Sequence, residues 1–139
     1  MYLLDTYIIS ETRRPHRVNS NVTAWLAATD SNSLYTSVVV MMELERGILG
    51  MERKDPQQGA VLREWLSAVI KPAFAGRVLP IDERTTAICA ALHIPSQAPA
   101  NDAWIAATAL QYGYTLITRN TADFERIGAK LLNPFAGVV

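Results

Sequence analysis

The chain begins with MYLLDTYIIS (residues 1–10), in which the short apolar run YLL leads directly into Asp5. Apolar residues without polar alternation are typical of a strand that is buried on both faces, as in parallel sheets. The sequence therefore predicts a buried strand over residues 2–4. Asp5 follows at its carboxyl end, which in open α/β sheets is the edge where ligands bind.

Strands and helices are predicted to alternate along the rest of the chain. Further strands are expected over residues 33–37, 76–81, 115–118 and 130–134, and helices over 19–30, 38–50, 55–74, 82–94 and 101–114. Ser37 and Asp55 are expected N-caps, and Gly50 and Gly113 are expected helix ends. The valines of residues 38–40 also fit a strand. This order predicts an α/β fold with a mostly parallel sheet, in a single domain over residues 1–139.

The composition excludes several classes of protein. Lys plus Arg and Asp plus Glu both number 13, so the chain lacks the basic excess that is usual in proteins that bind nucleic acid through its backbone. The single cysteine, Cys89, excludes an intramolecular disulfide or a cysteine zinc site and is expected to be a small buried side chain. Neither a signal peptide nor an apolar run of about 18 residues is present, which predicts a cytoplasmic protein without a membrane span.

Four carboxylates fall at predicted strand ends or on predicted helices: Asp5, Glu43, Asp102 and Asp123. Asp123 follows the strand that ends at Thr118, as Asp5 follows the first strand. Asp102 shares a helical face with small and apolar residues, which turns it towards the sheet. Each acid also has a simpler reading. The three aspartates could be helix caps and nothing more, and Glu43 could be a solvent-facing residue.

Clustered carboxylates repel one another, and a divalent cation can compensate for their charge. Ligands that are all oxygen suit Mg²⁺, with Mn²⁺ as a substitute. Such a metal polarises a phosphate oxygen and activates water, which is the chemistry of phosphodiester hydrolysis. Candidate phosphate contacts are Arg13, Arg14, Arg17 and Arg119, whose alternative reading is a solvated charged surface.

Four ordered motifs resemble the PIN-domain family: YLLDT (residues 2–6), ELERG (43–47), DAWIAATA (102–109) and TRNTADF (118–124). The resemblance covers essentially the whole chain and is nearest to the VapC/FitB-like group, which includes plasmid-stability toxins of the StbB type. It implies a three-layer α/β/α fold and an Mg²⁺-dependent endoribonuclease. It further implies a toxin of a type II toxin-antitoxin system, with RNA as the substrate, a cognate antitoxin as the partner and a homodimer as the assembly.

The same resemblance implies residue roles. The acidic metal-binding and catalytic quartet is Asp5, Glu43, Asp102 and Asp123, and the supporting polar residues are Thr6, Thr118 and Asn120. Tyr7 departs from the family, which usually has asparagine there, and a phenol cannot reproduce two amide donors. This departure leaves open an alternative function, a catalytically attenuated PIN-like module that retains antitoxin or RNA binding. A response-regulator receiver, the third reading, would need a second acid beside Asp5.

Overall fold

The computed structural model describes residues 1–13 and 17–136, without the side chains of Asp123 and Arg126. Its centre is a five-stranded sheet in the order β3-β2-β1-β4-β5. The strands are β1 (Tyr2–Leu4), β2 (Leu34–Ser37), β3 (Val78–Leu79), β4 (Thr115–Ile117) and β5 (Leu131–Leu132). All four pairings are parallel, which confirms the predicted type of sheet.

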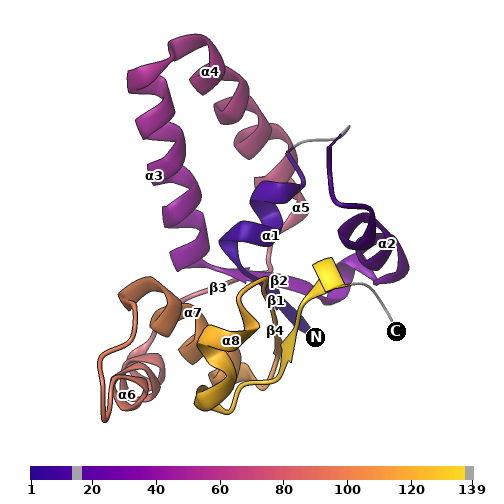
Figure 1. Cartoon of the computed structure of the whole chain (residues 1–139). Coiled ribbons are helices and arrows are strands. Elements are labelled where there is room, and N and C mark those ends of the chain that lie inside the picture. The colour runs from indigo at the N-terminus through magenta and orange to yellow at the C-terminus, as the bar shows by residue number, and fades with distance from the viewer. Residues whose placement is uncertain (14–16, 137–139) are drawn as a thin grey trace.

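Helices cover both faces of this sheet, so the fold has three layers (Figure 1). One face carries α1 (Thr6–Glu11), α3 (Val38–Lys54), α4 (Pro56–Trp65) and α5 (Lys71–Ala73). The other face carries α6 (Glu83–Leu92), α7 (Ala100–Tyr112) and α8 (Thr121–Phe124). Helix α2 (Ser20–Ala28) lies beside the C-terminal turn Pro134–Ala136. The three-layer α/β/α prediction is confirmed.

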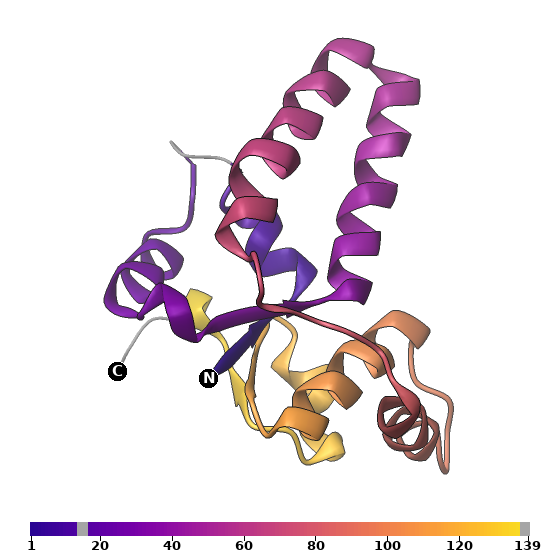
Figure 2. The ribbon, with the colours of Figure 1, turned by 180° about the vertical axis from the view of Figure 1, so that it is seen from behind.

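Helices α3 and α4 pair along their length and rise from the sheet as an arm, which is clear from both sides of the molecule (Figures 1 and 2). The predicted end of α3 at Gly50 is wrong, because the helix runs on to Lys54. Asp55 ends it instead, since a residue before proline disfavours helical geometry. Asp55 then caps α4, as predicted, by accepting a hydrogen bond from Gln58 N at 3.2 Å. A Cβ on Gly59 would lie 2.5 Å from Glu52 Cα, so only glycine lets the two helices approach this closely.

The helix predicted over residues 55–74 is present but is not uniform. After α4 the backbone widens into a π-helical segment, Leu66–Ile70, before α5. The other predicted helix ends are correct: Ser37 accepts a hydrogen bond from Val40 N at 3.2 Å, and Gly113 ends α7 with φ +70°. Residues 38–40 are therefore helical rather than a strand.

The core lies on both sides of the sheet. Leu3, Leu4, Leu116 and Ile117 are buried, as residues of parallel strands covered by helices should be. Cys89 is also buried, in a smaller cluster between α6 and α7, as the sequence predicts. Among the residues that the structure describes, no helix is long and apolar enough to cross a membrane.

Candidate functional site

The carboxyl ends of β1 and β4 lie side by side at the centre of the sheet. From β1 the chain moves to β2 and β3 on one side and later to β4 and β5 on the other, so the topology switches direction between β1 and β4. Open α/β sheets bind ligands at such a point. Asp5 follows β1 and Thr118 follows β4, and Asp5 N donates a hydrogen bond to Ile117 O at 3.1 Å.

Asp5 has the capping role that the sequence left open, and its role as a metal ligand stays a prediction. Its Oδ1 accepts a hydrogen bond from Ile8 N at 3.1 Å, so it caps α1. Burial raises the pKa of the Asp5 carboxyl above its ordinary value. Hydrogen bonds from the Thr118 hydroxyl and from Ile8 N lower that pKa, and the negative charge of Asp102 raises it. Thr118, itself buried, therefore supports Asp5 directly.

Asp102 lies in the first turn of α7, whose N-cap is Pro99, so the capping reading of Asp102 is wrong. The residues that share its face, Ile105, Ala106 and Ala109, are buried in the main core, which turns Asp102 towards the end of the sheet. Asp102 is half-buried and acts electrostatically on Asp5. The two aspartates thus form an acid pair whose mutual repulsion calls for a positive charge.

Glu43 joins three helices beside this acid pair. Its Oε1 accepts a hydrogen bond from Thr6 Oγ1 at 2.6 Å, and its Oε2 accepts one from Asn101 Nδ2 at 3.3 Å. Arg46 Nη2 lies 3.8 Å from Oε2. Thr6 therefore orients Glu43, and its supporting role in catalysis stays a prediction. Sequence reasoning missed Asn101 and Arg46, although Asn101 directly precedes Asp102 and Arg46 lies one helical turn after Glu43.

The donor set at this edge fits Mg²⁺. Within the described part of the chain, no three His, Cys, Asp or Glu side chains converge closely enough to hold one metal ion. Mg²⁺ is commonly held by only one or two carboxylates, together with waters and substrate phosphates. The acid pair of Asp5 and Asp102 meets that requirement with oxygen ligands. Metal ligation by Asp5, Glu43, Asp102 and Asp123 stays a prediction, and the side chain of Asp123 lies outside the described residues.

Two of the remaining predicted site residues, Asn120 and Arg119, lie in the turn after β4. Asn120 N donates a hydrogen bond to Thr118 Oγ1 at 3.1 Å, which shapes the turn after β4. Arg119, in the same turn, packs against Tyr7 and donates a hydrogen bond to the Tyr7 hydroxyl. Arg13 is exposed and lines a hollow with Thr6 and Glu43. Arg17 is exposed, and Arg14 lies outside the described residues.

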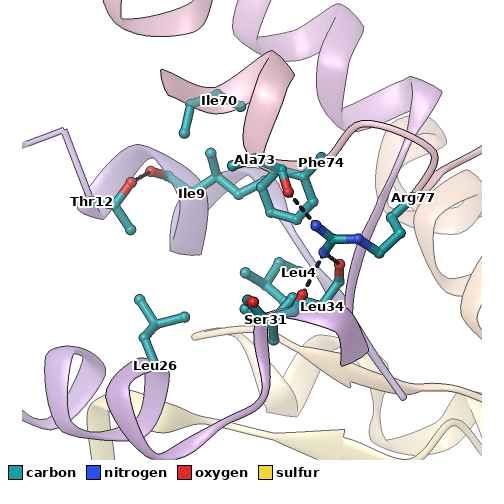
Figure 3. A pocket seen from close by; sticks show the side chains of 10 residues that line it. All are labelled: Leu4, Ile9, Thr12, Leu26, Ser31, Leu34, Ile70, Ala73, Phe74 and Arg77. Carbon is teal, nitrogen blue, oxygen red and sulfur yellow. Dashed lines mark hydrogen bonds between the residues drawn. The ribbon is translucent and has the colours of Figure 1, made fainter. Parts of the chain in front are cut away.

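A second hollow, of about 200 Å³, lies on the opposite side of α1 and is mostly apolar. Its lining is Leu4, Ile9, Thr12, Leu26, Ser31, Leu34, Ile70, Ala73, Phe74 and Arg77 (Figure 3). Arg77 closes one end by donating hydrogen bonds to the backbone carbonyls of Ser31, Leu34 and Ala73. We call this hollow the apolar pocket.

Comparison with known proteins agrees with the fold. Residues 2–130 match the family model of the PIN domain, and the chain belongs to the PIN domain family. The resemblance of the four sequence motifs is therefore confirmed.

Three curated relatives are similar over nearly their whole length. Toxin FitB of Neisseria gonorrhoeae is 38% identical, covering 97% of this chain and 99% of the relative. Plasmid stability protein StbB of Pseudomonas syringae pv. tomato is 39% identical with the same coverage. VapC ribonuclease Y4jK of Sinorhizobium fredii is 33% identical, covering 97% of this chain and 98% of the relative.

Among solved structures, FitAcB from Neisseria gonorrhoeae superposes with a TM-score of 0.86 at 38% identity. The match covers 97% of this chain and 99% of the matched chain. The fold described above is therefore that of a FitB-like PIN domain over essentially the full length.

Proposed function

We propose that the protein is an Mg²⁺-dependent endoribonuclease toxin of a type II toxin-antitoxin system, which hydrolyses RNA phosphodiester bonds. In this proposal residues 1–139 form a single domain. The observation that carries the proposal is the acid pair of Asp5 and Asp102 at the switch point of the sheet. Membership of the PIN domain family supports it, as do relatives named as a toxin and as a VapC ribonuclease.

In this proposal Asp5 and Asp102 hold the cation, and Mn²⁺ can replace Mg²⁺. The bound cation supplies Lewis acidity to a phosphate oxygen and to water. Thr118 orients Asp5 by hydrogen bonding, and Asp5 is in turn fixed at the start of α1. Thr6 and Asn101 orient Glu43 towards the same edge. Asp123 completes the proposed quartet.

The proposed partners are RNA, a cognate antitoxin and a second copy of the chain, and the proposed compartment is the cytoplasm. Antitoxin binding is supported by the similarity of the chain to the toxin FitB and to a chain of the solved FitAcB structure. Exposed apolar side chains near the acid pair, at Val38, Met42 and Ile81, offer surface for protein contacts.

An attenuated PIN-like binding module is the second candidate function. The observation that favours it is Tyr7, which replaces the usual asparagine beside the acid pair and engages Arg119. Growth arrest on expression of the protein, compared with that of a Tyr7→Asn variant, separates the two. If the native protein arrests growth, it is an active toxin; if only Tyr7→Asn does, Tyr7 attenuates it.

The direct test is cleavage of a mixed tRNA and rRNA pool by antitoxin-free protein with Mg²⁺, beside EDTA and an Asp102→Asn variant. An Asp82→Asn variant is the matched control, because Asp82 caps α6 and is hydrogen-bonded to Gln111, near the end of α7 opposite to Asp102. We expect cleavage that needs metal, is lost in Asp102→Asn and is retained in Asp82→Asn. Folded protein that does not cut, with Tyr7→Asn equally inactive, would favour the binding module.

A further inference from the structure

Tyr7, Arg119 and Phe135, which we call the aromatic cluster, gather three segments of the chain at the carboxyl edge of the sheet. The rings of Tyr7 and Phe135 meet edge to face, with centroids 5.7 Å apart. The Arg119 guanidinium carbon lies 5.1 Å from the Tyr7 centroid and 5.0 Å from the Phe135 centroid. Its Nη1 also donates a hydrogen bond to the Tyr7 hydroxyl. These contacts fix a normally flexible cation before any ligand arrives.

The aromatic cluster lies beside the acid pair. Arg119 follows Thr118, which donates a hydrogen bond to Asp5, and Tyr7 is two residues after Asp5. The carboxylates there repel a phosphate, and a chain with a formal net charge of zero attracts RNA only weakly at long range. A phosphate at this edge therefore needs a local cation. An arginine side chain has five N–H donors. Within the described part of the chain, the Arg119 guanidinium donates one hydrogen bond, to the Tyr7 hydroxyl.

Tyr7 provides a surface for a base next to that cation. Its side chain is 45% exposed although it is a large aromatic residue. Arg119 and Phe135 contact the ring but leave Tyr7 partly accessible to solvent. Proteins that bind single-stranded RNA use exposed aromatic rings of this kind to stack unpaired bases, next to cations that contact the backbone.

We propose that the aromatic cluster binds one unpaired nucleotide of the RNA, with Arg119 on its phosphate and Tyr7 stacked on its base. The proposal rests on the nuclease function above and adds the residues of this chain that hold one nucleotide beside the acid pair. A paired base inside a helix remains stacked on its neighbours and cannot lie on Tyr7.

A purely structural role for the aromatic cluster makes a different prediction. Asn21 Nδ2 donates a hydrogen bond to Phe135 O at 2.8 Å, and Asn133 Nδ2 donates one to Arg119 O at 3.4 Å. The cluster could therefore serve only to fasten the C-terminal segment to α1 and α2. In that case, changes to Tyr7 alter thermal stability and leave RNA binding unchanged.

The test uses short, random-sequence, single-stranded oligoribonucleotides that carry 2-aminopurine, a base whose fluorescence falls when it stacks. Ca²⁺ replaces Mg²⁺, so that binding is measured without turnover. The variants are Tyr7→Leu, Tyr7→Phe and Arg119→Gln. The matched control is Tyr112→Leu, since Tyr112 is 37% exposed and lies 5.7 Å from the ring of Tyr114 at the far end of α7. Thermal unfolding of each free variant is recorded in parallel.

We expect Tyr7→Leu to abolish the fluorescence quenching and to weaken binding roughly five- to 100-fold, the range for loss of one base–aromatic stack. Tyr7→Phe should keep the quenching. Arg119→Gln should weaken binding and reduce the slope of log affinity against log salt by about 0.7, the value for one phosphate contact on a single strand. Tyr112→Leu should bind as the native protein does.

Quenching and affinity in Tyr7→Leu equal to those of the native protein would overturn the inference, whatever happens to thermal stability. If the native protein still cleaves RNA in that case, the proposed function stands without it. If the native protein neither binds nor cleaves RNA, both proposals fail.

Discussion

Helix α1 separates two regions of opposite chemistry, the apolar pocket and the edge that carries the acid pair. Leu4 lines the apolar pocket, and Asp5, the next residue, belongs to the acid pair. The same division continues along α1. The hydroxyl of Thr12, the C-cap, donates a hydrogen bond to Ile9 O beside the apolar pocket (Figure 3). The hydroxyl of Thr6, at the other end of the helix, donates one to Glu43. The short stretch from Leu4 to Thr12 thus contributes residues to both regions.

The two regions differ in the charge that they hold and in its surroundings. In the apolar pocket, the cation of Arg77 is hydrogen-bonded to three backbone carbonyls. At the acid edge, hydrogen bonds from Thr118 and Ile8 N lower the pKa of Asp5, but burial and the charge of Asp102 leave that pKa raised. A perturbed pair of this kind is a stronger sign of function than the volume of a hollow.

The strongest test of this comparison replaces, one at a time, two aspartates that both cap helices. Asparagine is as good an N-cap as aspartate, so Asp5→Asn and Asp82→Asn should both keep their helices. We expect Asp5→Asn to lower the RNA cleavage rate by about 100-fold or more, and Asp82→Asn to leave it unchanged. An equal loss in both variants would show that capping, rather than the acid pair, limits activity.

The apolar pocket should respond in the opposite way. Arg77→Ala removes hydrogen bonds from a cation to three carbonyls, which should lower the free energy of unfolding by about 3 kcal/mol. Urea unfolding measures this loss, and cleavage per folded molecule should stay the same. Arg77→Lys, which cannot reach the three acceptors together, should be destabilised to a lesser extent. A fully stable Arg77→Ala variant would contradict the assigned role.

Two threonines at the ends of α1, Thr6 as its first residue and Thr12 as its C-cap, offer a closer comparison. Thr6→Val removes the hydrogen bond that orients Glu43 and should raise the Mg²⁺ concentration needed for half-maximal cleavage by about tenfold. Thr12→Val removes a hydroxyl from the apolar pocket side of the same helix and should leave that concentration unchanged. Equal behaviour of the two variants would mean that Glu43 does not act through Thr6.

The smallest expected effect is on stability against pH in metal-free protein. The folded pKa of Asp5 is raised, so the stability from its protonated form is fully present below the unfolded pKa of about 4 and is lost as pH rises through the folded pKa. In EDTA at neutral pH, Asp5→Asn should therefore unfold at a higher temperature than the native protein. At low pH the difference should vanish. A native protein that is the more stable of the two at neutral pH would contradict burial as the dominant cause.

The sequence predicts the order of strands and helices and the edge where the acids gather, because apolar runs and helix caps are local signals. The meeting of Asp5 and Asp102 could be inferred from the sequence, since the ends of parallel strands and the starts of the intervening helices lie at the same edge of the sheet. The end of α3 was missed because Gly50 is tolerated inside the helix, whereas the stronger stop comes from Asp55 before Pro56.

Contacts between distant segments could not be predicted in this way. Glu43 and Asn101 are 58 residues apart, and Arg119 and Tyr7 are 112 residues apart. Their meeting depends on how α1, α3 and α7 pack against the sheet, which no local pattern encodes. The departure at Tyr7 was visible in the sequence, but its pairing with Arg119 and Phe135 was not.

The central claim is that Asp5 and Asp102 together hold a divalent cation, and calorimetric titration of metal-free protein with Mg²⁺ and Mn²⁺ tests it most directly. We predict saturable binding to the native protein and to Asp82→Asn, and loss of that binding in Asp102→Asn. An Asp102→Asn variant that binds both ions as tightly as the native protein would contradict the claim and place the cation elsewhere.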